Sequence, residues 1–268
     1  MLTDAHCHPQ QILIPGRSTL QILAAASACE PEEFARNEEL AQIYAAEGPV
    51  KLLPCFAIHP QQFASHTEIK EKVPLDETDN CSLLTALYSF ASEGRLAAIG
   101  EFGFDLYNAE FRETEADQDK VFAAHLEIAR RFDLPVILHV RRAMDKIFAH
   151  AKNLAKCKAV IFHSWAGTYE EGQALLRQKV NAYFSFGNTI LNGHKQAQRC
   201  CSLFPAERLL TETDSPYQPR RGKNFSHWND LPAIIEAVSA LRREAGSETT
   251  DAKELKSQIE KNFRNIFK

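Results

Sequence analysis

Pro135-Val136-Ile137-Leu138-His139 and Ala159-Val160-Ile161-Phe162-His163 are two apolar runs that each end in a histidine. Between them, Met144–Leu154 has the spacing of an amphipathic helix. A strand, a helix and a second strand in this order predict a βαβ unit with parallel strands and a right-handed crossover. Both histidines are then expected at the same edge of the sheet.

The same alternation runs along the whole chain. The predicted strands are Met1–Ala5, Leu20–Ala25, Lys51–Ile58, Leu96–Glu101, Pro135–His139, Ala159–His163, Ala182–Ser185 and Arg208–Thr213. The predicted helices are Phe34–Ala46, Leu83–Glu93, Ala116–Phe132, Met144–Leu154, Glu170–Gln178, Leu231–Ala245 and Asp251–Lys268, the last packing Leu255, Ile259 and Phe263 inward. A length of 268 residues suits two small domains or one barrel. About eight such units without an internal linker predict a single (β/α)8 TIM barrel over residues 1–268.

Three segments are harder to assign. Leu20–Ala25 could equally open a helix, and Pro54 is awkward inside a central strand because it has no N–H to donate. Pro216–Asn229 contains prolines, arginines and aromatic residues without periodicity, and this composition predicts a loop over the barrel mouth.

Charge and cysteine content narrow the class of protein. The net charge is -4, from 31 Lys+Arg against 35 Asp+Glu, so there is no overall basic field to hold long duplex DNA, and a nucleic-acid substrate must be bound locally. The seven cysteines are scattered and include no Cys-x-x-Cys, which argues against a disulfide framework or a zinc knuckle. The start of the chain lacks the layout of a signal peptide, and no apolar run approaches membrane-spanning length. We expect a cytoplasmic protein with no membrane contact and no obligate protein partner.

Metal-ligand types recur at the predicted strand ends. In Asp4-Ala5-His6-Cys7-His8 the two histidines are spaced i, i+2, so on a strand both imidazoles point the same way and can reach one ion. Later strand ends add Glu101, His139, His163 and Asp214. Four imidazoles and two carboxylates suit a pair of divalent metals that catalyse hydrolysis. Because barrel active sites form at the carboxyl ends of the strands, the pattern predicts a metallohydrolase with its site at that mouth.

Each of these residues alone has another explanation. His139 or His163 alone fits a hydrogen-bonded core histidine about as well as a ligand. Asp214, two residues before Pro216, also fits an Asx turn or a helix N-cap. A buried Glu101 without a cation would be costly. Their shared placement favours the metal site.

Six blocks in order along the chain carry a resemblance to a known family. They are Asp4-Ala5-His6-Cys7-His8, Ile58-His59-Pro60, Ile99-Gly100-Glu101-Phe102-Gly103-Phe104-Asp105, Leu134-Pro135-Val136-Ile137-Leu138-His139-Val140-Arg141, Phe162-His163-Ser164-Trp165-Ala166-Gly167 and Thr211-Glu212-Thr213-Asp214-Ser215-Pro216-Tyr217. From Leu2 to about Phe267 the chain resembles the TatD family of metal-dependent deoxyribonucleases. The resemblance implies a barrel hydrolase related to the amidohydrolases, with 3′–5′ exonuclease or other DNase activity.

The resemblance also implies a ligand set of two divalent ions that share one carboxylate. The first ion would be held by His6, His8, Glu101 and Asp214, and the second by Glu101, His139 and His163. His59 matches a family histidine thought to contact the substrate phosphate or a metal-bound water. The residue types in this ligand set suit magnesium, manganese or zinc.

Catalytic and substrate roles follow from these positions. Asp214 is the expected general base, because a carboxylate on or beside the metal can accept the proton of the attacking water. Glu101 and His59 complete the expected catalytic set. Glu212 equally fits a residue that orients a ligand and a member of a buried ion pair.

The predicted substrate-binding residues are Arg141, Arg221, Trp165 and Tyr217, arginines for phosphate and aromatic rings for bases. Each of them also fits an ordinary surface charge or an aromatic cover over the site.

The chain departs from the family pattern after the last strand. TatD-like chains often carry Arg-Gly-x-x-Asn-Glu-Pro there, whereas Arg221–Pro232 reads Arg-Gly-Lys-Asn-Phe-Ser-His-Trp-Asn-Asp-Leu-Pro. The second strand and Val73–Asn80 also lack a family signature. The favoured hypothesis is a phosphodiesterase that acts on the ends of DNA or another nucleic acid. The alternative is a hydrolase of a small ester, lactone, amide or aminoacyl bond. A non-catalytic metal-stabilised binding protein is disfavoured, because all six ligands are retained.

Overall fold

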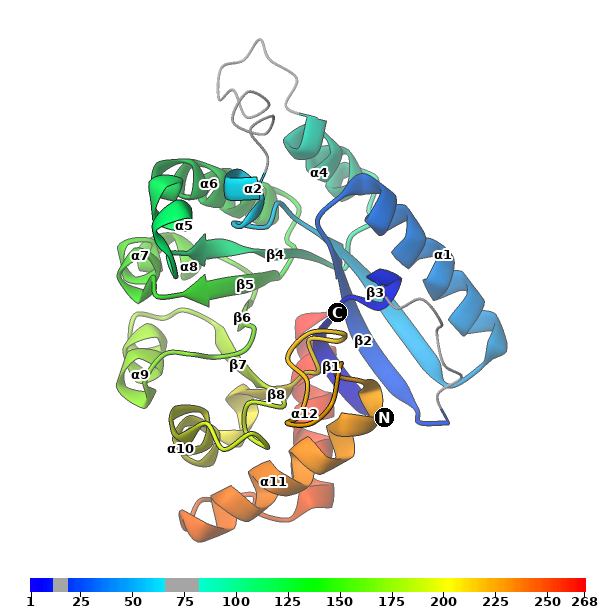
Figure 1. Cartoon of the computed structure of the whole chain (residues 1–268), viewed down its shortest axis with the longest axis vertical. Helices are drawn as coiled ribbons and strands as arrows, with labels where there is room; N and C mark the ends of the chain where they lie inside the picture. The colour runs from blue at the N-terminus through cyan, green and yellow to red at the C-terminus, as the bar shows by residue number, and fades with distance from the viewer. Residues whose placement is uncertain (12–18, 66–81) are drawn as a thin grey trace.

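The computed structural model describes residues 1–11, 19–65 and 82–268, and Val73–Asn80 lies outside these ranges. Eight parallel strands follow one another in chain order around a nearly closed TIM barrel (Figure 1). The strands are β1 (Leu2–Cys7), β2 (Ile22–Ala28), β3 (Val50–Phe56), β4 (Ala98–Asp105), β5 (Val136–Arg141), β6 (Val160–Phe162), β7 (Ala182–Phe186) and β8 (Leu209–Thr211). The predicted fold is confirmed, and the ambiguous second segment is a strand.

Helices alternate with the strands and lie outside them in Figure 1. They are α1 (Pro31–Glu47), α2 (Gln62–Ser65), α4 (Ser82–Ser92), α5 (Ala109–Glu113), α6 (Glu115–Arg131), α7 (Met144–Ala149), α8 (Ala151–Leu154), α9 (Tyr169–Arg177), α10 (Lys195–Leu203), α11 (Leu231–Glu244) and α12 (Ala252–Ile266). The predicted helix Met144–Leu154 is two short helices with His150 between them, and α2, α5 and α10 were not predicted. In the described ranges no helix is both long and apolar enough to cross a bilayer.

Pro54 is accommodated inside β3 by its position next to β4. Its carbonyl accepts a hydrogen bond from the Ala97 N–H at 2.9 Å, while the β3–β4 ladder pairs only Cys55 with Ala98 and Phe56 with Ile99. In a parallel strand the N–H and C=O of a residue point toward the same neighbour. Pro54 therefore faces β4 at a position just before the β3–β4 pairing begins, so its missing N–H removes no hydrogen bond of that pairing.

The seam between β8 and β1 is closed by hydrogen bonds around Asp4. Its carboxylate accepts from the backbone N–H of Thr213 at 2.9 Å and from the Thr213 hydroxyl, and the Thr211 hydroxyl donates to the Thr3 carbonyl at 3.0 Å. Just beyond, the Asp214 N–H donates to the His6 carbonyl at 3.0 Å. These bonds hold the ends of the first and last strands together, and both ends carry predicted metal ligands.

Two strands are irregular where a predicted ligand lies. In β1, Asp4 pairs with Ala24 and Cys7 with Ala26, so two residues, one of them His6, oppose one on β2. In β4, Gly100 pairs with Ile137 and Phe102 with Leu138, which leaves Glu101 outside the regular ladder. A bulge of this kind re-aims a side chain toward a site.

The predicted end of the fourth strand at Glu101 is wrong, because β4 continues past the bulge to Asp105. Gly103 permits this continuation. It has φ +151, and a Cβ there would lie 2.0 Å from the His139 carbonyl oxygen. Only glycine lets β4 approach β5 so closely at this point.

The final helix covers one end of the barrel interior. Leu255, Ile259 and Phe263 are buried, as predicted. Phe263 and Ile266 of α12 join a core cluster with small and branched residues of the strands, among them Ala25, Ala98 and Ile161.

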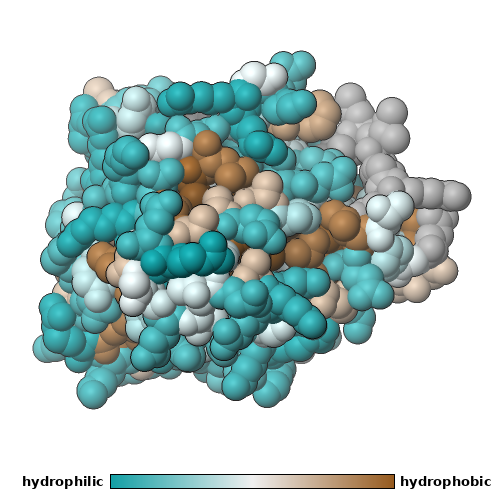
Figure 2. All heavy atoms as spheres, turned by 90° about the horizontal axis from the view of Figure 1, so that it is seen from below, coloured by the Kyte–Doolittle hydropathy of each residue, from teal (hydrophilic) through white to brown (hydrophobic). Residues whose placement is uncertain are grey.

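The face shown in Figure 2 is largely hydrophilic around a central hydrophobic band.

His125 of α6 holds the turn that carries His59. Its Nδ1 lies 2.7 Å from the Val121 carbonyl, its Nε2 accepts from the Ile58 N–H at 3.0 Å, and its ring stacks on Phe102. The ring is fully buried, and burial lowers its pKa from 6.5 to about 4 although the bond to Val121 opposes this. His125 therefore stays neutral in the folded protein at mildly acidic pH.

This neutral histidine makes stability fall in acid. Between about pH 6.5 and about pH 4 the unfolded chain binds a proton at His125 and the folded protein does not, so the free energy of unfolding falls by up to about 3 kcal/mol as the pH drops. We predict that His125→Gln, which can make both hydrogen bonds without titrating, flattens this dependence. Urea unfolding at several pH values checks it, and equal slopes for the two proteins would contradict it.

Candidate metal centre

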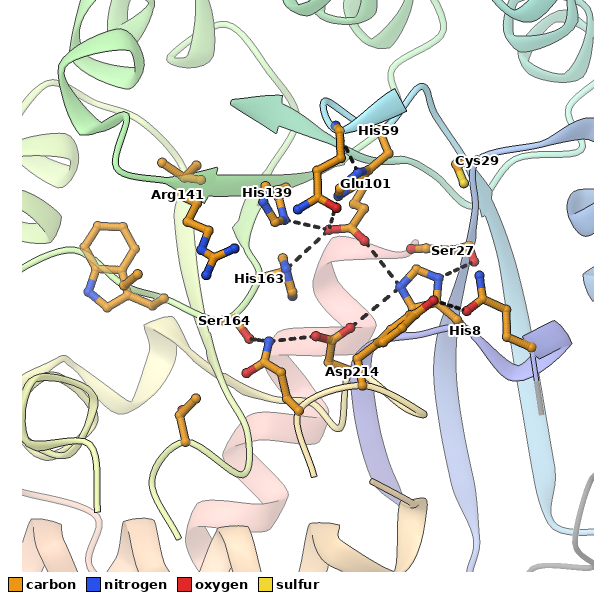
Figure 3. Close-up of a pocket in the computed structure, with 18 of the residues that line it drawn as sticks. His8, Ser27, Cys29, His59, Glu101, His139, Arg141, His163, Ser164 and Asp214 are labelled. Carbon is orange, nitrogen blue, oxygen red and sulfur yellow. Dashed lines mark hydrogen bonds and ion pairs between the residues drawn. The ribbon is translucent and has the colours of Figure 1, made fainter. Parts of the chain in front are cut away.

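The carboxyl ends of the strands surround a cavity of about 820 Å³. Figure 3 shows the side chains that project into it from several strands. Its wall includes five of the predicted ligands, namely His8, Glu101, His139, His163 and Asp214. The sixth ligand, His6, is completely buried beneath them. The structure thus brings all six predicted ligands together.

Ser27 on β2 orients the two histidines of the first block. The Nδ1 of His8 lies 3.1 Å from the Ser27 carbonyl, which can only accept, so Nδ1 carries the proton and Nε2 of the neutral ring has a free lone pair. The Nδ1 of His6 lies 3.0 Å from the Ser27 hydroxyl. As a result, the Nε2 atoms of His6 and His8 face each other at 3.0 Å. Sequence reasoning did not identify Ser27.

Two carboxylates converge on the same point. From the His6 Nε2, the Glu101 Oε1 lies at 3.1 Å and the Asp214 Oδ1 at 3.4 Å. From the His8 Nε2, the same oxygens lie at 3.3 Å and 3.6 Å. Two ring nitrogens and two carboxylate oxygens meet here, all nearly inaccessible to solvent. Burial opposes a charged His6, but the two carboxylates outweigh it and raise the pKa of His6 well above 6.5. This set of donor atoms fits a divalent cation.

The second oxygen of Glu101 faces a second group of histidines. Its Oε2 lies 3.3 Å from the His139 Nδ1, 3.3 Å from the His163 Nε2 and 3.7 Å from the His59 Nε2. This oxygen is buried, and His139 is placed to donate a hydrogen bond to it. Three imidazole nitrogens around one buried carboxylate oxygen form a donor set that fits a second cation in place of the His139 proton.

The grouping of the histidines differs in one respect from the one that the family resemblance implies. Donor atoms of His59, Glu101 and His139 lie within 4.8 Å of one another, and so do those of His6, His163 and Asp214. His163 thus stands between the two groups, and its ring centre is 4.3 Å from that of His6. His59 lies close enough to donate a ring nitrogen to the second group.

Two further carboxylates hold the histidines of the second group from behind. Asp105 Oδ2 lies 3.2 Å from the His139 Nε2, and Glu212 Oε1 lies 3.3 Å from the His163 Nδ1. Glu212 also accepts from the Ser164 N–H at 2.8 Å. Carboxylates in this position fix the tautomer and the orientation of a metal-binding histidine. Of the two interpretations of Glu212, the contacts favour the residue that orients a ligand.

Opposite charges face one another in the cavity. Burial by itself raises the pKa of Glu101, but the surrounding histidines outweigh it and hold this pKa well below 4.5. Burial also opposes a charged His139, yet its bonds to Asp105 and Glu101 raise its pKa to about 9. Burial lowers the pKa of His59 to about 3. Glu101 is therefore negatively charged. Neutral His59 accepts from the Gln61 N–H at Nδ1 and so carries its proton on Nε2, which faces Glu101.

Gln218, from the loop after β8, fixes the orientation of Asp214. Its Nε2 donates to the Asp214 Oδ2 and to the Ser164 hydroxyl, both at 2.6 Å, while Oδ1 of Asp214 faces the histidines (Figure 3). The Asn188 side chain donates to the Gln218 carbonyl at 3.2 Å. Gln218 lies just before the segment that departs from the family pattern, but nothing local in the sequence shows that its side chain reaches Asp214.

The predicted substrate residues lie at different depths. Arg141 lines the cavity wall, and Tyr217 stands at the rim with half of its surface exposed and its ring 5.4 Å from that of His8. Trp165 lines the wall too, but it is 4% exposed and packs against Phe184. Arg221 is exposed on the loop, where its N–H donates to the Asn192 side chain, and it does not line the cavity.

Comparison with known proteins places the chain in a family. The sequence model of the TatD-related DNases matches residues 3–268. The chain belongs to this family. As a TatD-family protein, it is a metal-dependent hydrolase.

Its relatives include enzymes with a named activity. The TatD-family protein is 31% identical over 191 residues to the 3′-5′ ssDNA/RNA exonuclease TatD of Klebsiella pneumoniae, with 68% of this chain and 69% of that protein covered. It is 26% identical over 263 residues to the uncharacterized metal-dependent hydrolase YjjV of Escherichia coli, with 93% of each chain covered.

Solved structures show the same fold. The crystal structure of Escherichia coli YjjV, a TatD homolog, matches with a TM-score of 0.78 at 23% identity and covers 99% of this chain and 97% of that one. An uncharacterized amidohydrolase from Saccharomyces cerevisiae matches with a TM-score of 0.73 at 16% identity and covers 91% and 88%.

We predict that Gln218→Leu weakens cation binding by the TatD-family protein about 10- to 100-fold, the range expected when a partner of a metal ligand is lost. The substitution removes both N–H donors and frees the Asp214 carboxylate to rotate. Calorimetric titration of metal-stripped protein with manganese or zinc measures the change. Gln198→Leu, which removes an amide donor on α10, is the matched control. Unchanged affinity in Gln218→Leu would contradict the role given to this residue.

Proposed function

We propose that this protein is a nuclease that removes nucleotides from the 3′ end of DNA by hydrolysing phosphodiester bonds. The observation that carries the proposal is the convergence of two histidine groups on the two oxygens of Glu101, inside a cavity with Arg141 on its wall. Relatives named 3′-5′ ssDNA/RNA exonuclease support the direction and the substrate.

The two donor sets support two proposed cation positions. His6, His8, Glu101 and Asp214 would hold one ion, and Glu101, His139 and His163 the other, with His59 beside it. Magnesium, manganese and zinc all remain open, because both oxygen and imidazole donors are present. When bound, such ions polarise the phosphoryl oxygens and lower the pKa of a water molecule.

Asp214 is proposed to move the proton. Its Oδ2 accepts one hydrogen bond from Gln218 and keeps a second lone pair that can take a proton from the attacking water. His59 is proposed to contact the substrate phosphate, because burial keeps it neutral while it faces Glu101. Glu101 is proposed to contact both donor groups, one with each carboxylate oxygen, and to take no proton itself.

Four residues around the cavity are proposed to bind substrate. Arg141 binds a phosphate on the wall, and Tyr217 stacks on a base at the rim, where half of its surface is open. Trp165 contributes a ring edge to the wall rather than a free face, since it is almost completely buried. Arg221 contacts the strand outside the cavity.

The alternative function, hydrolysis of a small ester, lactone, amide or aminoacyl bond, is favoured by two observations. The net charge is negative, and the loop after β8 lacks the family's usual sequence. A cavity of about 820 Å³ also lies in the range of small-molecule sites.

Turnover on two substrates separates these functions. Metal-stripped protein is loaded with magnesium, manganese or zinc and assayed on a labelled single strand and on bis(p-nitrophenyl) phosphate. We predict metal-dependent stepwise shortening of the strand from its 3′ end. Loss of a residue that only orients a metal ligand costs about 10- to 100-fold in activity. His6→Ala and Asp214→Ala should each lose more than this, because each removes a proposed metal ligand.

The matched control is His150→Ala, which removes a histidine that pairs with Asp119 outside the cavity. It should retain activity, and all three variants should keep the circular dichroism spectrum of the parent. Cleavage of the small diester alone would support the small-molecule alternative. Activity that survives both His6→Ala and Asp214→Ala would show that the site is wrongly assigned.

A further inference from the structure

Two consecutive arginines stack on one exposed tyrosine beside the cavity. The guanidinium carbon of Arg141 lies 3.6 Å from the ring centre of Tyr107, and that of Arg142 lies 4.5 Å from it. Arg141 is the last residue of β5 and points into the cavity in Figure 3, while Tyr107 follows the end of β4. The cluster therefore begins at the cavity wall and extends outward over the β4–β5 side of the mouth.

The backbone at Arg142 brings the two side chains to the same ring. Consecutive side chains of a strand point to opposite faces, so Arg142 would ordinarily point away from Tyr107. Arg142 has φ 56, in the left-handed region that residues other than glycine seldom adopt. Its guanidinium donates to the Tyr107 carbonyl at 3.2 Å, which keeps it beside the ring.

A third arginine reaches the same place from α5. The Arg112 guanidinium donates to the Leu106 carbonyl at 3.3 Å and to the Tyr107 carbonyl at 3.4 Å. Three cationic side chains, from the end of β5, the residue after it and α5, thus converge around Tyr107. All three arginines and the tyrosine are exposed.

Little negative charge faces this cluster. Among residues 1–11, 19–65 and 82–268, neither Arg112 nor Arg142 has a carboxylate oxygen within 4.0 Å, and Arg141 has only Asp105, at 3.9 Å. By contrast, Arg199 pairs with both oxygens of Glu170. Uncompensated arginines held in place on a protein of net charge -4 are available for an anion that comes from outside.

We propose that Arg142 and Arg112, held by Tyr107, bind the backbone phosphates of a single-stranded nucleic acid just beyond the bond that is cleaved. The inference rests on the proposed function and deepens it. A small diester reaches only the donor groups of the cavity, whereas a strand that leaves along Arg141 passes over this cluster. Guanidinium groups bind phosphate through paired N–H donors, which makes them suited to this contact.

The test compares a long substrate with a short one. kcat and KM are measured on a single-stranded oligonucleotide and on bis(p-nitrophenyl) phosphate for the parent, Arg142→Ala, Arg112→Ala and the double variant. We expect KM for the oligonucleotide to rise about tenfold for each removed arginine, with kcat nearly unchanged. Both constants for the small diester should stay the same. Arg142→Lys, which keeps the charge and loses the paired donors, should fall in between.

The dependence on salt gives an independent measure. Each phosphate contact that is lost should make the plot of log kcat/KM against log salt concentration less steep by ~0.7 for a single strand. The matched control is Arg131→Ala. Arg131 stacks on Tyr88, which is as exposed as Tyr107 but lies on the outer helices away from the cavity. This variant should change neither KM nor the salt dependence.

The outcomes separate this inference from the proposed function. An unchanged KM in Arg142→Ala and Arg112→Ala, with the oligonucleotide still cleaved, overturns the inference and leaves the function standing. Equal losses of kcat/KM on the oligonucleotide and on the small diester, together with a lower Tm, also overturn the inference, because they indicate a structural role for the arginines. If the parent does not cleave the oligonucleotide, fluorescence anisotropy of the labelled strand decides. Weaker binding by Arg142→Ala supports the phosphate contact, and equal binding by all variants overturns it.

Discussion

Glu101 is the residue on which the whole site depends. Its two oxygens face two separate histidine groups, and both oxygens lie among ring nitrogens in a buried position. A charged carboxylate in that position is destabilising unless cations balance it, so folding and cation binding are coupled at this point. The bulge in β4 matters for the same reason. Ala98 belongs to the cluster inside the barrel, so regular alternation from Ala98 would turn Glu101 outward. The bulge lets Glu101 face both groups while Phe102 packs against Phe122 of α6.

The rest of the scaffold brings distant segments to Glu101. The Asp4 carboxylate joins β1 to the segment that carries Asp214, so the first and the last strand deliver ligands to one point. Ser27 on β2 turns the imidazole rings of His6 and His8 toward each other. In these contacts Asp4 and Ser27, which lie outside the proposed ligand set, fix the position of the proposed ligands.

The sequence was sufficient to predict the barrel and to name six donor residues that the structure brings together, because apolar runs that end in histidine or carboxylate residues are local patterns. It was insufficient where a residue acts through a distant partner. Asp105 on β4 orients His139 on β5, and Gln218 reaches Asp214 from an irregular loop whose backbone has φ 50 at this residue. The helix α10 was missed because its buried face consists of small residues such as Cys200 and Cys201 rather than large aliphatic ones.

Charge balance connects the centre to its surroundings. Four carboxylates, Asp105, Glu101, Glu212 and Asp214, lie at the donor groups or directly behind their histidines, and two divalent cations would neutralise them without excess. A phosphodiester that enters such a neutral centre adds a negative charge, and each further phosphate of a strand adds another. The compensating charge must then come from outside the donor groups. Arg141 and the arginines around Tyr107 stand on the side of the mouth where it is needed.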